Sequence, residues 1–133
     1  LQYWLNFKLP AVLRKHKADV FVSIGNCSLR TKLPQCLVVN DLSFLHHPQF
    51  FTRSWFRFYK KNTPAFLSRA TIITTAAEFL KQDIIETYKI NAGKVHVVYQ
   101  GINKIFTPAD WQQKEIIKGE YTSGKEYFLY THF

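Results

Sequence analysis

The sequence has 133 residues, 47% of them hydrophobic and 20% charged. This is enough for about one ordinary domain with a buried core, and it excludes intrinsic disorder as the main state. It has no uncharged apolar run near the roughly 18 residues of a spanning helix, and Lys8 and Pro10 interrupt the stretch where a signal peptide would be apolar. We therefore expect a cytoplasmic protein.

The formal net charge of +9 is distributed unevenly. Residues 1–77 hold 11 Lys and Arg side chains against two acidic ones, whereas residues 78–133 hold seven of each sign. Such an excess favours an anionic partner, which is a membrane surface, a nucleic acid or a phosphorylated ligand. Because the sequence starts at Leu1 and contains no methionine, we also expect it to be a piece of a longer protein.

Four short apolar runs predict strands, at residues 19–24, 36–39, 71–74 and 95–99. None of them alternates strictly between apolar and polar side chains. Continuous apolar runs are typical of parallel sheets whose strands are buried on both faces.

The segments between these runs predict helices. Residues 2–15 form the first, with Pro10 as a break or kink, and residues 50–61 form the most amphipathic one. Pro64 is expected to interrupt that helix before a short turn at residues 65–69. Thr75 and Glu78 have the spacing of a capping box, which predicts a helix over residues 76–88.

Strands that alternate with helices indicate βαβ units, so the expected fold class is α/β, a Rossmann-like parallel sheet with flanking helices. Ligands of such sheets bind beyond the carboxyl ends of the strands. Four dipeptides follow those ends and form the candidate cleft: Gly25-Asn26, Asn40-Asp41, Thr75-Ala76 and Gln100-Gly101.

The cysteine and histidine residues give no metal motif. Cys27 and Cys36 lack the spacing of a zinc site and are expected to be reduced and structural. The five histidines form no HExxH pair, and we interpret His46 and His47 as loop residues rather than ligands or bases.

Three segments in chain order carry a family resemblance. Residues 37–44 read LVVNDLSF and are followed by His46, His47 and Pro48; residues 70–84 read ATIITTAAEFLKQDI; and residues 94–103 read KVHVVYQGIN. Together they resemble the corresponding segments of family 4 glycosyltransferases, in order over residues 19–108. Three such segments in the right order are a more specific signal for the family than any one of them alone.

The resemblance implies a GT-B architecture, in which two Rossmann-like domains face each other across a cleft. Residues 1–117 would be part of the N-terminal, acceptor-side domain. Residues 118–133 would be the interdomain linker, at 118–126, and the first strand of a C-terminal donor domain, at 127–130. The full protein would be a retaining glycosyltransferase of the hexosyltransferase type.

The same resemblance implies the partners of that enzyme. A nucleotide-sugar donor would bind mainly to the C-terminal domain, and the acceptor would be a glycan or a lipid-linked hydroxyl compound of polysaccharide or glycolipid biosynthesis. No metal cofactor is expected, because positive side chains and helix dipoles of the donor domain would neutralise the leaving diphosphate. This chain alone is expected to be inactive.

The family pattern transfers unevenly to the cleft residues. Asn40 stands where the family often has His, and an amide cannot shuttle a proton near neutral pH. Asp41 matches, and would orient a sugar hydroxyl or cap the backbone of residues 42–44. Ala76 replaces a serine and Gln100 an asparagine, while Gly101 fits a turn. The candidate acceptor-cleft residues are Asn40, Asp41, Thr75, Ala76, Glu78, Gln100 and Gly101.

The helix predicted at residues 50–61 is a candidate membrane contact, which would make the protein peripheral on the inner face of the membrane. Basic and aromatic side chains together suit an anionic leaflet, and the candidates are Arg53, Trp55, Arg57, Lys60 and Lys61. A helix packed on the sheet with a solvated basic face is the alternative. Other classes remain open: a basic nucleic-acid-binding module, and a degenerate scaffold homologue.

Overall fold

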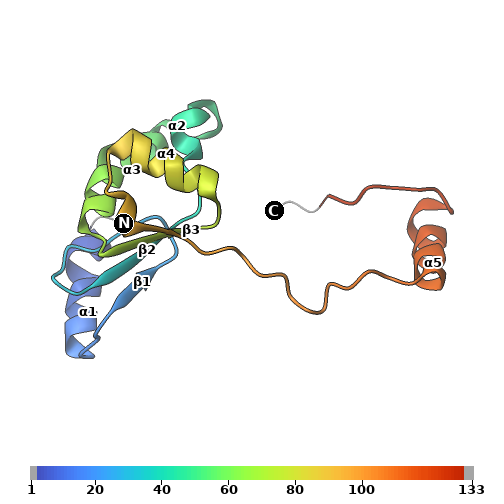
Figure 1. The fold of residues 1–133 in the computed structure, drawn as a ribbon, viewed down its shortest axis with the longest axis horizontal. Helices are drawn as coiled ribbons and strands as arrows, with labels where there is room; N and C mark the ends of the chain where they lie inside the picture. Colours follow the sequence, from blue (N-terminus) through green and yellow to red (C-terminus); the bar gives the residue numbers. More distant parts are fainter. Residues whose placement is uncertain (1–2, 131–133) are drawn as a thin grey trace. The chain divides into compact units, whose positions relative to one another are not determined.

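The computed structural model describes residues 3–130 and divides the chain after Gln100 into two units (Figure 1). The first unit contains a four-stranded sheet in the order β1-β2-β3-β4. The strands are β1 Phe21–Ser23, β2 Gln35–Val39, β3 Ile72–Thr75 and β4 Val95–Val97, and all neighbours are parallel. The predicted α/β, Rossmann-like class is confirmed. The strands β1 and β4 are shorter than predicted, β2 is one residue longer, and β3 is shifted by one residue.

One face of this sheet carries the core. Along β2, fully buried side chains alternate with half-buried ones, so Leu37 and Val39 point into the core while their neighbours do not. On the other face, Val22 remains 56% exposed and Ile72 43% exposed. The expectation of strands buried on both faces is therefore wrong for the described residues. An apolar run indicates a strand, but it does not show whether other elements cover both faces of the sheet.

The helix predicted at residues 50–61 is longer than expected. It forms α3, Arg53–Arg69, after the short helices α2, Ser43–His46, and η2, Pro48–Phe50. Pro64 lies inside α3 and does not interrupt it. Phe66 and Leu67 are buried in the core beyond Pro64, and this packing stabilises the helical backbone that the proline alone would disfavour.

The N-terminal helix changes from π-helix to α-helix just before Pro10, and the helical backbone does not break there. A π-helical turn, η1 Trp4–Lys8, leads into α1, Leu9–Lys15. Pro10 lies in the first turn of α1. Because the chain is already helical before it, with Leu9 N donating to Trp4 O, the missing N–H of Pro10 interrupts the hydrogen-bond ladder where the helix changes type. Residue 2 of the predicted helix lies outside the described residues.

The predicted capping box does not form. Helix α4, Glu78–Tyr88, begins two residues later than expected, with Ala77 as its N-cap and no side-chain cap bond. Thr75 is the last residue of β3 and pairs with Val39 and Val97. Because the strand fixes its backbone, the Thr75 hydroxyl is buried in the sheet instead of turned toward the helix.

The core lies between the sheet and the helices α3 and α4. Its fully buried members include Leu37, Leu67, Ile73 and Ile84, and each such side chain contributes about 1.5–3 kcal/mol relative to exposure. Both cysteines are free thiols. Cys27 belongs to the core, whereas Cys36 is only half-buried.

The second unit contains the helix α5, Trp111–Thr122, whose N-cap Asp110 accepts a hydrogen bond from Gln113 N at 2.8 Å. The helix includes residues 118–122, which were expected in a linker. Residues 127–130 form no strand, since no described strand of this unit offers a pairing edge. The boundary between residues 1–117 and 118–133 stays a prediction. Across residues 3–130, helices fall short of the combined length and apolarity needed to cross a bilayer.

Candidate functional site

The carboxyl ends of three strands meet at one edge of the sheet. Val39, Thr75 and Val97 are register partners at the ends of β2, β3 and β4. A hollow of about 240 Å³ lies beyond them, lined by Asn40, Thr75, Ala76, Gln100 and four neighbouring residues. We call it the central hollow. The side-by-side arrangement predicted from the sequence thus brings four of the seven candidate residues together.

Asn40 ties the end of β2 to the turn after β1. Its backbone N donates to Asn26 Oδ1 at 2.9 Å, and its Nδ2 donates to the carbonyl of Ile24 at 3.1 Å. Asn26 adopts the left-handed conformation, with φ of 56°, which Asn tolerates better than most residues. The Asn40 amide is thereby oriented, and its carbonyl oxygen Oδ1 is left to accept a hydrogen bond.

Asp41 holds the backbone at the start of α2. Its Oδ1 accepts a hydrogen bond from Ser43 N at 2.8 Å, the contact of an Asx turn. This is the structural role that the sequence offered as one of two. The side chain is exposed, so its second oxygen remains available to solvent or a ligand.

A second hollow of about 340 Å³, here the histidine hollow, adjoins the first at Asn40. Asp41, His46, His47 and Asp83 also line it. His46 Nε2 lies 2.6 Å from Asp83 Oδ2, and the Thr87 hydroxyl donates to Asp83 Oδ1 at 3.0 Å. His46 therefore has a fixed orientation. Its interpretation as a loop residue was wrong, since it is the last residue of α2, whereas His47 does lie outside that helix.

Asp83 is the site residue that sequence reasoning missed. It lies on the helix α4, 37 positions from His46, and no spacing rule connects two residues at that separation. Its position next to the cleft results from the parallel crossover that places α4 beside α2. No local signal in the sequence could have identified it.

The start of α4 differs from the capping box that the sequence predicted. Glu78 is exposed and lines neither hollow. Thr75 Oγ1 is fully buried without a hydrogen-bond partner, which costs free energy in an apolar environment. Gly101 is the first residue of the second unit.

The candidate membrane residues lie along α3 and differ in their surroundings. Trp55 is 49% exposed and stacks on Tyr59 with 5.6 Å between ring centroids. Lys60 Nζ lies 5.3 Å from the centroid of the Phe56 ring, and Arg53, Arg57 and Lys61 are exposed. Phe56, Phe58 and Tyr59 pack against the core, so the helix both packs on the sheet and presents basic groups to solvent.

The two hollows offer two uncharged amides, two imidazoles and two carboxylates, which are groups that exchange hydrogen bonds with sugar hydroxyls. Within the part of the chain that the structure describes, no three His, Cys, Asp or Glu side chains converge to hold a metal ion. The absence of a metal from the reaction stays a prediction.

Comparison with known proteins identifies the family. The sequence profile of Glycosyltransferase Family 4 matches residues 1–104. The chain belongs to this family. The match includes the whole four-stranded sheet and both hollows. No curated protein and no solved structure matches the chain. Membership makes this a glycosyltransferase chain, with a sugar donor and an acceptor as its general partners.

Proposed function

We propose that this chain is the acceptor-side part of a retaining glycosyltransferase, which transfers a hexosyl group from a nucleotide-sugar to a hydroxyl acceptor. The acceptor is a growing glycan, a polysaccharide or a glycolipid. Residues 1–117 hold the acceptor, and residues 118–133 lead to a donor-binding domain. The reaction uses no metal cofactor.

The observation that carries this proposal is the pair of adjoining hollows at the carboxyl edge of the sheet. Asn40 lines both, with Oδ1 left as an acceptor of hydrogen bonds. Asp41 and His46 stand on one side and Gln100 on the other. Such a row of neutral and acidic polar groups suits several hydroxyls of one sugar better than a single anion.

We assign binding rather than proton transfer to Asn40, because an amide has no titration near neutral pH. Asp41 uses one oxygen for the Ser43 backbone and offers the other to a hydroxyl. His46, oriented by Asp83, presents its second ring nitrogen to the same ligand. These three residues would fix the acceptor's orientation, which is a large part of the advantage an enzyme offers to a transfer reaction.

A peripheral membrane attachment through α3 is part of the proposal. Trp55 is half-exposed on the same helix as the exposed cations Arg53 and Arg57, and aromatic and basic groups together favour an anionic interface. Trp55→Ala together with Arg57→Gln should reduce cosedimentation with anionic vesicles, while Lys89→Gln, on an exposed residue after α4, should not.

Activity of the protein that contains this chain, measured with a panel of UDP- and GDP-sugars, tests the main proposal. We expect turnover with one of these donors. The anomeric proton signal of the product should show that the transferred sugar keeps its anomeric configuration. Asn40→Ala should raise KM for the acceptor more than KM for the donor. Turnover by the 133-residue chain alone would contradict the proposal, since donor binding is assigned to a further domain.

A further inference from the structure

A second group of hollows lies at the amino-terminal edge of the sheet, opposite the candidate cleft. One, of about 730 Å³, is lined by Arg14, Asp19, Arg30 and Lys32 among others. The other, of about 450 Å³, is lined by Arg30, Lys61 and Arg69 among others. Arg30 and Asn6 line both, so the two hollows adjoin, and we call them together the basic groove.

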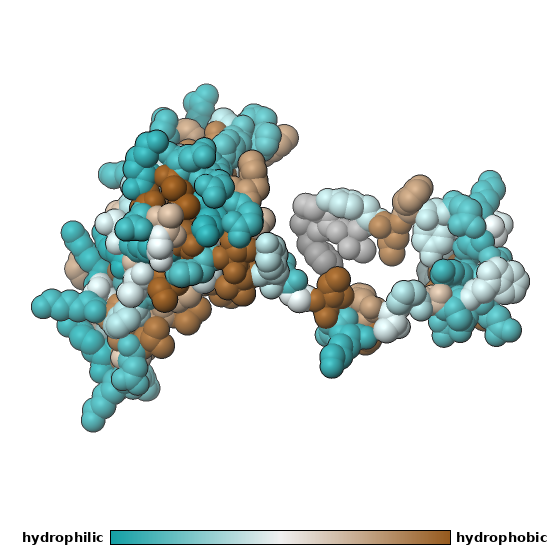
Figure 2. Space-filling view, viewed as in Figure 1, coloured by the Kyte–Doolittle hydropathy of each residue, from teal (hydrophilic) through white to brown (hydrophobic). Residues whose placement is uncertain are grey.

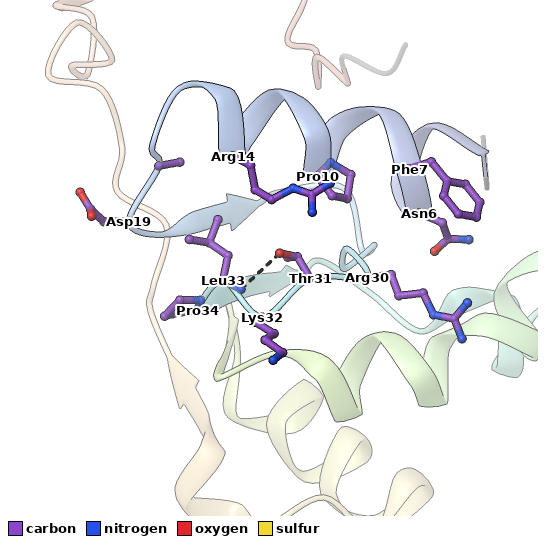
Figure 3. A pocket seen from close by; sticks show the side chains of 11 residues that line it. Asn6, Phe7, Pro10, Arg14, Asp19, Arg30, Thr31, Lys32, Leu33 and Pro34 are labelled. Atoms are coloured by element: carbon purple, nitrogen blue, oxygen red, sulfur yellow. Dashed lines mark hydrogen bonds between the residues drawn. The ribbon is translucent and has the colours of Figure 1, made fainter.

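The topology places this groove away from the cleft. Asp19 and Lys32 precede the strands β1 and β2, and Arg69 precedes β3, so all three lie at the ends where strands begin. Figure 3 shows α1 on one side of the strands and α3 on the other, with the Arg30 side chain extending from the loop toward α3. Arg30 thus joins the two parts of the groove.

The charge of the groove is not compensated within the first unit. It holds five cations, Arg14, Arg30, Lys32, Lys61 and Arg69, against the single carboxylate of Asp19. Among the described residues the ion pairs involve only His46, Asp83, Lys118, Glu115 and Glu126, so none of the five cations has a carboxylate partner. Hydrophilic side chains extend from the part of this unit that holds α1 (Figure 2).

Buried hydrogen bonds fix the loop that carries Arg30. Gln35, 2% exposed, accepts from Leu29 N at 2.7 Å and donates to Leu29 O at 3.0 Å. Thr31 Oγ1 accepts from Leu33 N at 3.3 Å, which leaves the Thr31 hydroxyl hydrogen free to donate. Preorganised donors lose less entropy on binding than a mobile loop does.

Hydrogen bonds at the end of α3 leave Arg69 available to the groove. Lys94 Nζ donates to the carbonyls of Leu67 and Ser68 at 2.8 and 2.9 Å. These two carbonyls near the end of the helix are thus satisfied by Lys94 and do not need Arg69. The Arg69 guanidinium therefore remains available to the groove. Arginine presents five N–H donors in a planar fork, the geometry that matches phosphate oxygens.

We propose that the basic groove binds a phosphate-bearing ligand with two or more negative charges, such as a diphosphate or a phosphorylated headgroup. Arg14, Arg30 and Arg69 would contact phosphate oxygens, and Thr31 and Asn6 would add neutral hydrogen bonds. The site is separate from the cleft at the opposite edge of the sheet, and the proposal does not depend on glycosyl transfer.

Titration of the ¹⁵N-labelled 133-residue chain with inorganic pyrophosphate tests the site directly. We expect saturable shifts of the amides of Arg30, Thr31 and Lys32, with a dissociation constant that rises with salt. Arg30→Gln should weaken binding about twofold to fivefold, as for one exposed ion pair, and Arg14→Gln with Arg30→Gln by more. Lys15→Gln, on the same helix as Arg14 but outside the groove, should bind as the unmodified chain does.

Vesicles of phosphatidylcholine with and without phosphatidylglycerol distinguish the ligand's source. Pyrophosphate binding without vesicle binding identifies a soluble phosphate compound, and vesicle binding that pyrophosphate displaces identifies a lipid headgroup; both support the proposal. It is overturned by the absence of saturable pyrophosphate binding, or by equal affinities of Arg30→Gln and Lys15→Gln. Because these side chains are exposed, unchanged circular dichroism serves as the folding control, and Lys32→Gln replaces any variant that fails it.

Discussion

His46 Nε2 and Asp83 Oδ2 lie 2.6 Å apart and connect α2 to α4 across the cleft edge. His46 is 50% exposed at its side chain and Asp83 only 12%. The contact therefore belongs to the wall of the histidine hollow and is partly screened by water. Its contribution to stability is expected to be modest, while its effect on the orientation of the imidazole is direct.

A double-mutant cycle with His46→Ala and Asp83→Ala should give a coupling free energy of about 1 kcal/mol, near the upper range for an exposed pair. Urea unfolding of the four proteins measures it. Glu86→Ala, an exposed acidic residue on the same helix, combined with His46→Ala, should show no coupling. A value indistinguishable from zero for the first cycle would mean that the contact does not form in solution.

The uncapped start of α4 predicts a stabilising substitution. Ala77 has extended backbone angles, φ −149° and ψ 146°, and no side-chain cap, so Ala77→Ser should add a hydrogen bond to the first turn. The expected gain is about 1 kcal/mol, measured as a shift of Tm. Ala76→Ser is the matched control and should leave Tm nearly unchanged. If Ala76→Ser gives the larger gain, residue 76 is the N-cap and the helix begins one residue earlier, at Ala77.

The buried Thr75 hydroxyl predicts a second stabilising change. Thr75 is 1% exposed and its Oγ1 has no hydrogen-bond partner, so Thr75→Val keeps the shape and removes a polar group from an apolar site. We expect the free energy of unfolding to rise by up to about 1 kcal/mol. Thr71→Val is the opposite case, because Thr71 Oγ1 accepts from Gln35 N at 3.1 Å. A destabilised Thr75→Val variant would show that its hydroxyl has a partner in solution.

The two cysteines should differ in reactivity. Burial raises the pKa of Cys27 from 9.0 to about 11, so at pH 8 only about one thiol in a thousand is the reactive thiolate. Cys36 is half-buried on the sheet and should react first with iodoacetamide, as peptide mass mapping would show. Faster labelling of Cys27 in the folded protein would contradict the burial.

The same shift gives a pH dependence of stability. The unfolded thiol ionises near pH 9, whereas the folded one keeps its proton to about pH 11, so the native state binds more protons between these values. The free energy of unfolding should fall as the pH rises through this range. Burial also raises the pKa of Tyr88 to about 12, so the free energy of unfolding should continue to fall toward that pH. Cys27→Ala should flatten the first part of the curve.

The sequence determined the strands, their parallel order and the carboxyl-edge dipeptides, because hydrophobic runs and turn residues are local signals. Asn40, Thr75, Ala76 and Gln100 do share one hollow. Glu78 does not line it, since the helix that carries it begins later than its sequence suggests.

Long-range packing and strand pairing account for the remaining features. Burial of Phe66 and Leu67 keeps α3 helical through Pro64, and pairing in β3 removes Thr75 from the cap of α4. The His46–Asp83 contact and the basic groove unite residues that are far apart in the chain. Local patterns specify which backbone each segment favours, but crossovers and packing specify which segments meet, and those contacts involve residues that no short window of sequence contains.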